Sequence, residues 1–453
     1  MTSELGQLSR YWKFPSDYYH RSLQVLEIAL NQVPAYRSWR AFDPGTASPV
    51  DARYASLPAF TKQDIREYFP QGLLPASRNV QAGLTSGEIS FVKTSGTVDM
   101  SVTNIWHQPW WDASESASWQ LNAHAARLAT GQHHEAILVN PMNVGIISDD
   151  VDLPVEKRRL ARFLYLNEKT NPTRWTKALM DRMIAELDDF RPAVLEANPS
   201  LLARLCRYIA AAKKTVYRPG LIVLTYEFPT HWHYQQISRV FTCPVASSYG
   251  TTETGYVFMQ CEEGRFHQNS QVCRVDFQPF KTEHGGPFKG RILVTTFNNP
   301  WYYMVRFDVG DLVCLDETGK CPCGRNSGLI LSAVEGRTAA LTLTSAGRPV
   351  TQRELDNALS TLEGIDEYKL EQRDGNTYHL YLASGRPDKD GLSKEAADIL
   401  IKLYGRGINV SVTYEDDISP ESSGKYRTAK TLFPINVEDY LDENYLIHRK
   451  TEP

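Results

Sequence analysis

Apolar residues recur at helical spacing early in the chain. Between Tyr19 and Val33 they lie close to one helical turn apart, which predicts an amphipathic helix. A second helix is predicted to begin at Thr61, because its hydroxyl can accept the free N–H groups of a first turn that carries Asp64. Capping alone accounts for this second segment, so by itself it indicates no function.

Short apolar blocks follow from about residue 130 to residue 330. They predict buried strands at Ala136–Val139, Leu221–Leu224 and Gly290–Thr296. The first two are separated by predicted helices at Arg174–Phe190 and Leu201–Ala212. Strands that alternate with helices favour an α/β fold with a largely parallel sheet, in which ligands bind beyond the carboxyl ends of the strands.

The pattern changes after Arg337. Two helices and two alternating strands are predicted there, at about Thr351–Leu362, Leu392–Leu403, Tyr378–Leu382 and Val410–Tyr414. This mixture indicates a small α+β domain. The predicted domains are therefore residues 1–336 and residues 337–453.

Composition agrees with at least two globular domains, since 453 residues exceed what one hydrophobic core usually supports. A formal net charge of −4 provides no general attraction to nucleic acid or to an anionic membrane. The chain has no apolar run of about 18 residues, and its first residues lack the apolar core of a signal peptide. A cytoplasmic protein is therefore expected. Its seven cysteines are odd in number and widely spread, which does not indicate a disulfide framework.

Two glycine-containing segments carry groups that suit phosphate. Ser95-Gly96-Thr97 can form a turn whose N–H and O–H groups surround phosphate oxygens, although a plain turn is the commoner use of such residues. Ser248–Gly255 combines hydroxyls, the aromatic Tyr249 and the carboxylate of Glu253, which are the parts that a magnesium nucleotide site needs. A polar turn is the alternative there.

Two further segments each present one charged side chain. Asp311 follows a Gly turn, from which it can accept ribose hydroxyls or merely cap the turn. Lys425 lies in a Ser-Gly-rich stretch. It is either a solvated surface lysine or a cation that approaches a developing phosphate charge.

Taken together and in this order, the motifs resemble those of the adenylate-forming superfamily of acyl-CoA synthetases, peptide-synthetase adenylation domains and luciferase. Within it the chain looks like the phenylacetate–CoA ligase family. Four further segments support that branch: Leu57–Arg66, Thr225–Phe228, Cys321–Arg325 and Val334–Arg337. The resemblance runs from about residue 57 to residue 434. It implies a large α/β domain of mixed and parallel sheets with a small β-barrel-like part, followed by a small mobile α+β domain.

The resemblance implies that ATP is bound by the matching motifs. The implied nucleotide-binding residues are Ser95, Gly96, Thr97, Glu227, Ser248, Tyr249, Gly250, Thr251, Thr252, Asp311 and Arg337. Tyr249 would lie against the adenine, Asp311 would bind the ribose hydroxyls, and Arg337 would assist on the ribose or phosphate side.

The implied catalytic residues are Thr252, Glu253 and Lys425. Thr252 would reach the α-phosphate, Glu253 would hold Mg²⁺, and Lys425 would contact the substrate carboxylate and the bridging oxygens. The acid attacks the α-phosphorus and pyrophosphate leaves, so positioning and electrostatics dominate. In this superfamily the small domain then rotates about its hinge and opens a channel for a thiol.

The expected protein is thus an AMP-forming carboxylate–CoA ligase that uses ATP, Mg²⁺ and coenzyme A. Transfer to the phosphopantetheine thiol of an acyl carrier protein or to an amine is the alternative, and a non-catalytic nucleotide- or acyl-binding protein is a third reading. The family favours an aromatic acid. Trp106, Trp110 and Trp111 either wall an apolar pocket or pack in the interior, which is the commoner use of large aromatics. A homodimer is the default expectation.

Several positions depart from the family's pattern. Asp99 stands in a phosphate loop that lacks the usual second Gly and Lys, and Thr338-Ala339-Ala340 replace the acidic hinge residues. Gly347 survives in the segment that takes the place of the thiol-channel turn. Lys430 is a second lysine only five positions after Lys425, so it is an alternative for the catalytic role.

Cys261, His267, Cys321 and Cys323 form a candidate zinc site. Three thiolates and one imidazole suit a closed tetrahedral structural Zn²⁺. The Cys-x-Cys spacing is tighter than that of common zinc knuckles, but similar residues bind zinc in some relatives of the family. Three reduced thiols near the surface are the alternative.

Overall fold

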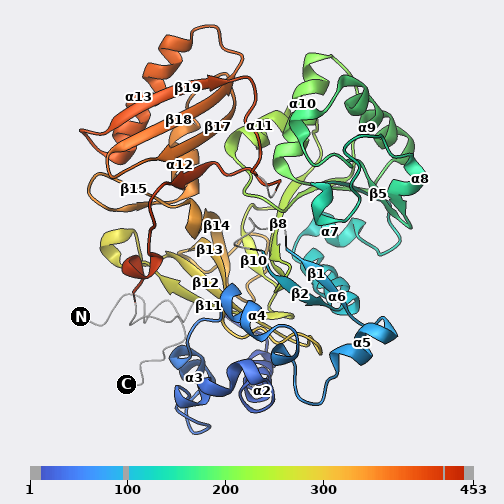
Figure 1. Cartoon of the computed structure of the whole chain (residues 1–453), viewed down its shortest axis with the longest axis vertical. Helices are drawn as coiled ribbons and strands as arrows, with labels where there is room; N and C mark the ends of the chain where they lie inside the picture. The colour runs from blue at the N-terminus through green and yellow to red at the C-terminus, as the bar shows by residue number, and fades with distance from the viewer. Residues whose placement is uncertain (1–11, 95–100, 422–423, 443–453) are drawn as a thin grey trace. The chain divides into compact units, whose positions relative to one another are not determined.

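The computed structural model describes residues 12–94, 101–421 and 424–442 (Figure 1). In this part of the chain, no helix is both long and apolar enough to cross a membrane. The chain forms two compact units. The first comprises Met1–Ala126, Ser248–Ala333 and Leu441–Pro453, and the second comprises Arg127–Ser247 and Val334–Tyr440. Each unit draws on both predicted domains, so the division into residues 1–336 and 337–453 stays a prediction.

The first unit begins with helices that follow the predicted apolar spacing. α2 (Tyr18–Gln32) coincides with the helix predicted for Tyr19–Val33. α4 (Lys62–Tyr68) starts at a capping box between Thr61 and Asp64, as predicted. The unit also contains α3 (Val50–Ser56), α5 (Val80–Ser86) and α6 (Gln108–Trp119), and α7 (Ala123–Leu128) leads the chain out of it.

Antiparallel pairing dominates the strands of the first unit. β1 (Ser90–Lys93) pairs with β2 (Thr103–Trp106). The larger sheet has the order β11-β12-β13-β14-β10-β9-β8. Its strands are β8 (Val245–Thr251), β9 (Gly255–Gln260), β10 (Phe266–Gln268), β11 (Cys273–Pro279), β12 (Lys289–Thr296), β13 (Phe307–Leu315) and β14 (Ile330–Arg337). The strand predicted at Gly290–Thr296 is β12. β8 and β14 cross from one unit to the other along the chain.

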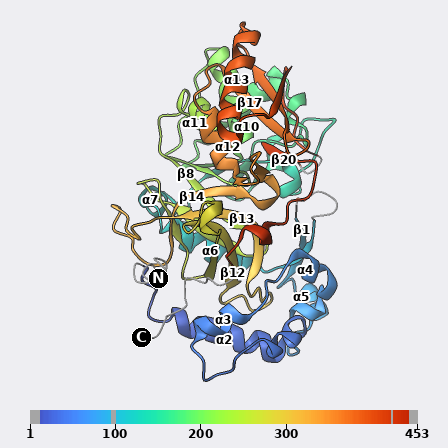
Figure 2. The same ribbon diagram turned by 90° about the vertical axis from the view of Figure 1, so that its left-hand side faces the viewer.

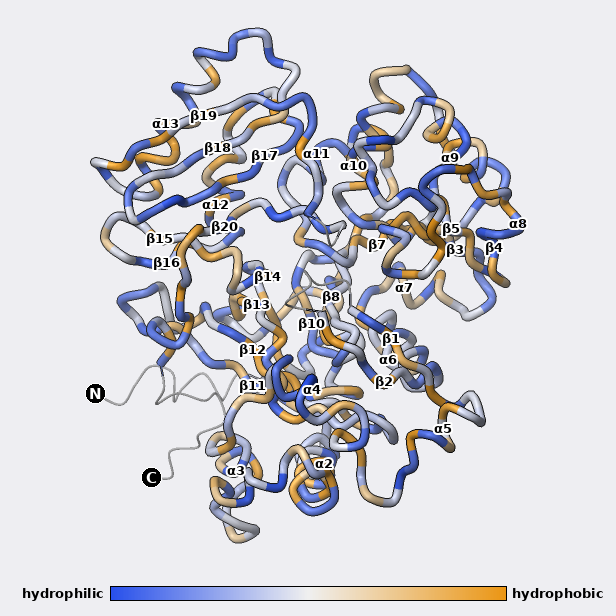
Figure 3. Tube along the Cα trace, viewed as in Figure 1, coloured by the Kyte–Doolittle hydropathy of each residue, from blue (hydrophilic) through white to orange (hydrophobic). Residues whose placement is uncertain are grey.

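The second unit contains the predicted parallel sheet. β3 (Glu135–Leu138), β5 (Phe163–Tyr165), β6 (Val194–Ala197) and β7 (Leu221–Leu224) run parallel, with the short β4 (Arg159–Leu160) antiparallel at the edge. The neighbouring helices are α8 (Val155–Arg158), α9 (Lys177–Phe190), α10 (Pro199–Ala211) and α11 (His231–Ser238). Figure 3 shows β3, β5 and β7 as largely hydrophobic, in accord with a sheet covered on its faces.

A second, smaller sheet lies in the same unit. Its order is β19-β18-β17-β20, and α12 and α13 pack against it (Figure 2). The elements are α12 (Gln352–Leu359), β17 (Ile365–Gln372), β18 (Thr377–Ser384), α13 (Lys389–Tyr404), β19 (Asn409–Glu415) and β20 (Ala429–Thr431), with the short pair β15 (Thr342–Leu343) and β16 (Pro349–Val350) before them. The two helices and two strands predicted after Arg337 are confirmed.

Trp232 of α11 completes the core of this small sheet. Its side chain is 2% exposed and packs with the buried residues of α12, α13 and β17, and its ring meets that of Tyr368 edge-on at 5.2 Å. Polar contacts flank it, because Arg207 donates to Glu367 at 2.7 Å and the backbone N–H of His231 donates to Asp356 at 2.9 Å. Residues 334–440 are therefore joined to α10 and α11 by apolar and polar contacts together.

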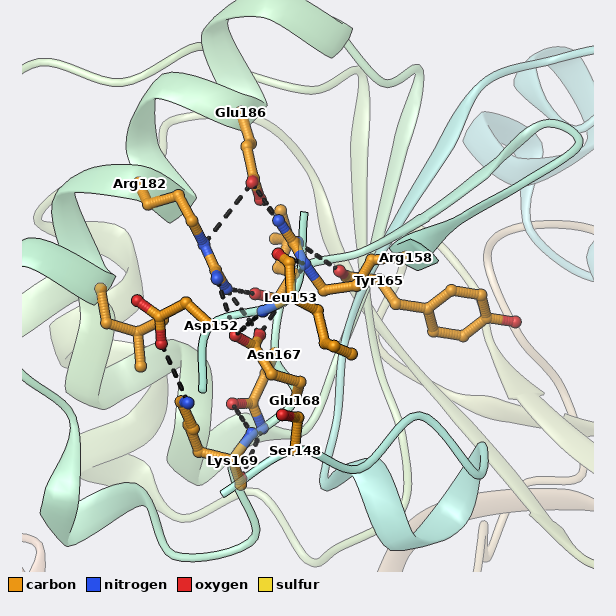
Figure 4. A network of polar contacts seen from close by, with 12 residues as sticks. Ser148, Asp152, Leu153, Arg158, Tyr165, Asn167, Glu168, Lys169, Arg182 and Glu186 are labelled. Carbon is orange, nitrogen blue, oxygen red and sulfur yellow. Dashed lines mark hydrogen bonds and ion pairs between the residues drawn. The ribbon is translucent and has the colours of Figure 1, made fainter. Parts of the chain in front are cut away.

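A buried ionic network fixes the end of α8, which directly precedes β4 (Figure 4). Glu168 is fully buried and pairs with Arg182 at 2.6 Å and with Arg158 at 3.8 Å. Arg158 also pairs with Glu186 and donates to the carbonyl of Tyr165 at 2.8 Å. Because buried charges are costly unless they are paired, this set of opposite charges ties α8 to β5 and α9.

Candidate functional site

The motif Ser248–Gly255 forms a β-hairpin in the first unit. β8 and β9 pair through Tyr249 with Phe258 and Gly250 with Tyr256, and Thr251 and Thr254 share a hydroxyl contact of 2.9 Å in the turn. A Cβ at Gly250 would lie 2.3 Å from the carbonyl oxygen of Gly255, so only glycine fits this close approach. The hairpin presents Thr251, Thr252 and Glu253 in one short turn.

Two predicted nucleotide residues are brought together beside this hairpin. The hydroxyl of Tyr249 donates a hydrogen bond of 2.8 Å to Asp311 Oδ2. Asp311 lies on β13 and is 6% exposed, whereas Tyr249 is half-buried. A carboxylate has two oxygens and can accept several hydrogen bonds, so this contact orients Asp311 and leaves it further acceptor capacity.

Glu253 is a buried carboxylate beside a lysine of α4. It is 3% exposed, and its Oε1 lies 3.8 Å from Lys62 Nζ. Oε1 makes no hydrogen bond to any described residue. A buried carboxylate oxygen without a hydrogen bond is costly, and a hard cation is a ligand that would satisfy it. The chemistry of Glu253 thus fits the predicted Mg²⁺ ligand.

Glu227 lies in the second unit, at the end of β7, and contacts the segment that contains Lys425. Its Oε1 accepts the backbone N–H of Tyr426 at 3.1 Å, and its Oε2 accepts the hydroxyl of Ser200 at 2.6 Å. Burial raises the pKa of its carboxyl, against the effect of hydrogen bonds from Asn198, Ser200 and Tyr426 and of the nearby charge of Lys425. Its contacts are thus with the start of α10 and with the lysine segment.

The two candidate lysines have different surroundings. Lys430 lies on β20 and pairs with Glu371 at 2.9 Å on the small sheet. Lys425 precedes β20, between Gly424 and Tyr426. Its charge acts to lower the pKa of the Glu227 carboxyl, which desolvation raises. Arg337 is the last residue of β14 and directly precedes a 3₁₀ turn, η6 (Thr338–Ala340).

The remaining predicted positions fall into two groups. Ser95, Gly96 and Thr97, and with them Asp99, lie outside the described residues. Trp110 is 8% exposed and donates its indole N–H to the carbonyl of Phe297 at 2.8 Å, in accord with a packing role. Trp106 and Trp111 contact each other with ring centroids 4.3 Å apart.

The predicted zinc ligands converge in the first unit. Cys261 follows β9, His267 lies on β10, and Cys321 and Cys323 lie between β13 and β14. Their ligand atoms all lie within 4.8 Å of one another. Cys261 Sγ is 3.7 Å from Cys321 Sγ, and Cys323 Sγ is 3.3 Å from His267 Nε2. Zinc bond lengths in a tetrahedron give edges of about 3.8 Å for S···S and about 3.6 Å for S···N.

The direction of the pKa shift differs among the members of this cluster. Burial lowers the pKa of His267 to about 4, so the imidazole is neutral at pH 7 and keeps a lone pair for a metal. Burial raises the pKa of the Cys321 thiol to about 12, whereas hydrogen bonds from Arg325 and neighbouring thiols outweigh burial and lower that of Cys323. The four residues fit Zn²⁺.

Some site residues were missed from the sequence. Sequence patterns do not single out Lys62, Asn140, Asn198 or Ser200 as site residues. A signal was available for two of them, since Asn140-Pro141 and Asn198-Pro199 each follow a parallel strand directly or by one residue. Parallel strands end at one edge of a sheet, where ligands bind.

Comparisons with known proteins agree with this architecture. No family model matches the chain. Protein CapK of Staphylococcus aureus is 24% identical over 250 residues, which are 54% of this chain and 54% of CapK, so the match spans about half of that relative. The crystal structure of 2-hydroxyisobutyryl-CoA ligase in the postadenylation state, in complex with R3-HIB-AMP, aligns with a TM-score of 0.67 and 17% identity over 93% of this chain and 91% of the ligase. The same ligase with 2-HIB-AMP and CoA in the thioesterification state aligns with a TM-score of 0.53 and 18% identity over the same shares of 93% and 91%.

These likenesses establish the fold. The chain has the large mixed α/β fold of adenylate-forming enzymes, as the motifs predicted. The narrower resemblance to the phenylacetate–CoA ligase family stays a prediction.

Proposed function

We propose that this chain, which has the fold of an adenylate-forming ligase, is an AMP-forming acid–thiol ligase that activates a carboxylic acid with ATP and transfers the acyl group to coenzyme A. The observation that carries the proposal is a fold shared over 93% of the chain with a ligase crystallised with an acyl-adenylate. Glu253 supports the proposal. It occupies the position that the resemblance assigns to the Mg²⁺ ligand, and its buried Oε1 has no hydrogen bond to any described residue.

In the first step, the substrate carboxylate attacks the α-phosphorus of ATP, the bond to the bridging oxygen breaks, and pyrophosphate leaves. Glu253 would hold Mg²⁺, which offsets the phosphate charge when bound. Asp311, oriented by Tyr249, would accept the ribose hydroxyls. Lys425 would bring an ammonium group to the carboxylate and bridging oxygens, so that catalysis rests on positioning and electrostatics.

In the second step, a thiolate attacks the acyl carbon of the adenylate and AMP leaves, which forms a thioester. Coenzyme A is the proposed acceptor, since the ligase of similar fold is known in complex with CoA. A carrier-protein thiol or an amine is the alternative acceptor. We keep an aromatic acid as the proposed substrate on the strength of the family resemblance alone.

Cys261, His267, Cys321 and Cys323 are proposed to hold a structural Zn²⁺. The Cys261–Cys321 distance of 3.7 Å and the Cys323–His267 distance of 3.3 Å lie close to the edges of a zinc tetrahedron. All four ligands come from protein, so the metal would have no open position for substrate. The metal would cross-link the loop between β13 and β14 to the β9–β10 hairpin.

The test is pyrophosphate release with a panel of aromatic and short aliphatic acids, with and without coenzyme A, for the wild type and Lys425→Ala. The proposal expects acid-dependent release that falls at least about a hundredfold in the variant, with acyl-CoA among the products. Release without acyl-CoA would redirect the second step to a carrier protein or an amine. No release with any acid, together with no ATP binding by calorimetry, would overturn the proposal.

A further inference from the structure

Three neighbouring parallel strands of the second unit are followed by polar side chains that are buried or half-buried. Asn140 follows β3, Asn198 follows β6 and Glu227 follows β7, and β3, β6 and β7 are adjacent in the sheet. Asn140 and Asn198 are each 2% exposed, and Glu227 is half-buried. Buried polar groups require partners, and here the partners include the segment Gly424–Tyr426.

The contacts with this segment are made to its backbone. Glu227 Oε1 accepts the N–H of Tyr426 at 3.1 Å. Asn140 Nδ2 lies 3.5 Å from the carbonyl oxygen of Gly424 and donates at 3.1 Å to the carbonyl of Thr170. The two side chains thus hold the residues on either side of Lys425.

Glu227 is itself held in place. Ser200 donates its hydroxyl to Oε2 at 2.6 Å, and Asn198 adds a hydrogen bond to the carboxylate. Asn198 in turn caps α10 by accepting the N–H groups of Ser200 and Leu201. The carboxylate is therefore fixed by the start of a helix, which leaves it little freedom of its own.

The position of Gly424 shows how close this packing is. Its φ is +75°, and a Cβ there would lie 2.1 Å from Asn140 Nδ2. Only a glycine allows the chain to approach Asn140 in this conformation.

We infer that Glu227 and Asn140 are positioning residues for Lys425: they dock the backbone of Gly424–Tyr426 and so hold the lysine for the adenylation step. The inference rests on the proposed function for the role of Lys425 and reassigns Glu227 from nucleotide binding to lysine positioning. The charge of Lys425 also acts to lower the pKa of the half-buried Glu227 carboxyl, against the effect of desolvation, which favours the docked position of the lysine segment.

The first test measures the docking without any activity. Hydrogen exchange of the Tyr426 amide, followed by mass spectrometry, should be about tenfold faster or more in Glu227→Ala, because the acceptor of that N–H is lost. The matched control is Glu196→Gln. This buried acid lies on the adjacent β6 and accepts the hydroxyl of Tyr226, and its replacement should leave Tyr426 exchange unchanged. Unchanged exchange in Glu227→Ala, or equal acceleration in Glu196→Gln, would overturn the inference.

The second test separates positioning from nucleotide binding. In Glu227→Gln and Glu227→Ala, the kcat of acid-dependent pyrophosphate exchange should fall about tenfold and about a hundredfold, respectively, with KM for ATP within about threefold of the wild type. Thioester formation from a preformed acyl-adenylate should change by less than about threefold, since the lysine acts only before it. A rise in KM for ATP at constant kcat would return Glu227 to nucleotide binding. Lack of exchange in the wild type itself would count against the proposed function, while the hydrogen-exchange result would still decide the docking.

Discussion

Tyr249 donates its hydroxyl to Asp311, so the side chain proposed to face the adenine also orients the side chain proposed to bind the ribose. The two residues lie on β8 and β13, which are not neighbours in the sheet, and 62 positions separate them in the sequence. The nucleotide base and sugar would therefore be recognised by a coupled pair.

This coupling predicts the effect of Tyr249→Phe, which keeps the aromatic face and removes only the hydroxyl. Asp311 loses one hydrogen bond and with it part of its orientation. We expect KM for ATP to rise about fivefold to tenfold with kcat changed less than about twofold, as loss of one hydrogen bond to a charged group implies. Steady-state kinetics with varied ATP provide the measurement. An ATP KM equal to that of the wild type would show that the contact is only structural.

Glu253→Gln should change the need for metal. The substitution keeps the shape of the side chain but removes the charge that a hard cation requires. The Mg²⁺ concentration for half-maximal pyrophosphate exchange is expected to rise about tenfold or more. Glu263→Gln is the matched control, because Glu263 is exposed and lies in the next turn along the chain, between β9 and β10. A similar shift in both variants would contradict the assignment of Glu253.

The cysteine cluster predicts about one zinc per chain in protein purified without chelators. Cys321→Ser should abolish zinc binding and lower the melting temperature, because the loop between β13 and β14 is then no longer cross-linked by the metal. Elemental analysis and thermal unfolding measure the two effects. Cys314→Ser serves as the control, since Cys314 is only half-buried and lies outside the cluster. Metal-free wild-type protein with an unchanged melting temperature after zinc addition would exclude the site.

Asp356 predicts a pH dependence of stability. Burial raises the pKa of its carboxyl to about 6, above the value of about 3.9 for an unfolded chain. The folded protein therefore binds this proton more tightly than the unfolded chain, and the free energy of unfolding falls as the pH rises from about 4 to about 6, by about 3 kcal/mol at most.

Asp356→Asn removes this titration while it keeps an oxygen that can accept the N–H of His231. The melting temperature of the variant relative to the wild type should therefore be higher at pH 7 than at pH 4. Asp390→Asn, at an exposed position of α13, should show no such trend. A constant difference across this pH range would disagree with the raised pKa.

Trp232→Ala should destabilise residues 334–440, because it empties space in their core. Removal of a buried large aromatic side chain costs about 3–5 kcal/mol. Limited proteolysis should show faster cleavage in this part of the chain, and Trp232→Phe should restore most of the resistance. Equal resistance in the wild type and Trp232→Ala would show that the small sheet does not depend on α11.

Regular elements could be predicted where one physical signal dominates. Leu221–Leu224 is a short apolar block, and it is β7 with the predicted bounds. Thr61 and Asp64 formed the predicted cap, since capping depends on local sequence. β6 was missed because Glu196 interrupts its apolar residues.

Candidate site residues could be named where a motif is continuous, or where residue type and the family resemblance single them out, as for Asp311 and the four zinc ligands. The hairpin Ser248–Gly255 is one continuous segment, whereas the surroundings of Lys425 are assembled from Asn140, Ser200 and Glu227 on separate elements. Which strand ends meet depends on the order of strands in the sheet, and local sequence patterns do not contain that order. The burial of Trp232 was missed for a similar reason, because its partners follow more than 100 positions later.

The insertion of Trp232 has a consequence for engineering by exchange of parts. A chimera that takes its C-terminal region from a relative would receive a core shaped for that relative's own α11, and the indole of Trp232 would meet a cavity of the wrong size. The unit of exchange is therefore not a continuous stretch of sequence. A graft that carries α10 and α11, with Arg207 and Trp232, along with residues 334–440 keeps the side chains that contact one another.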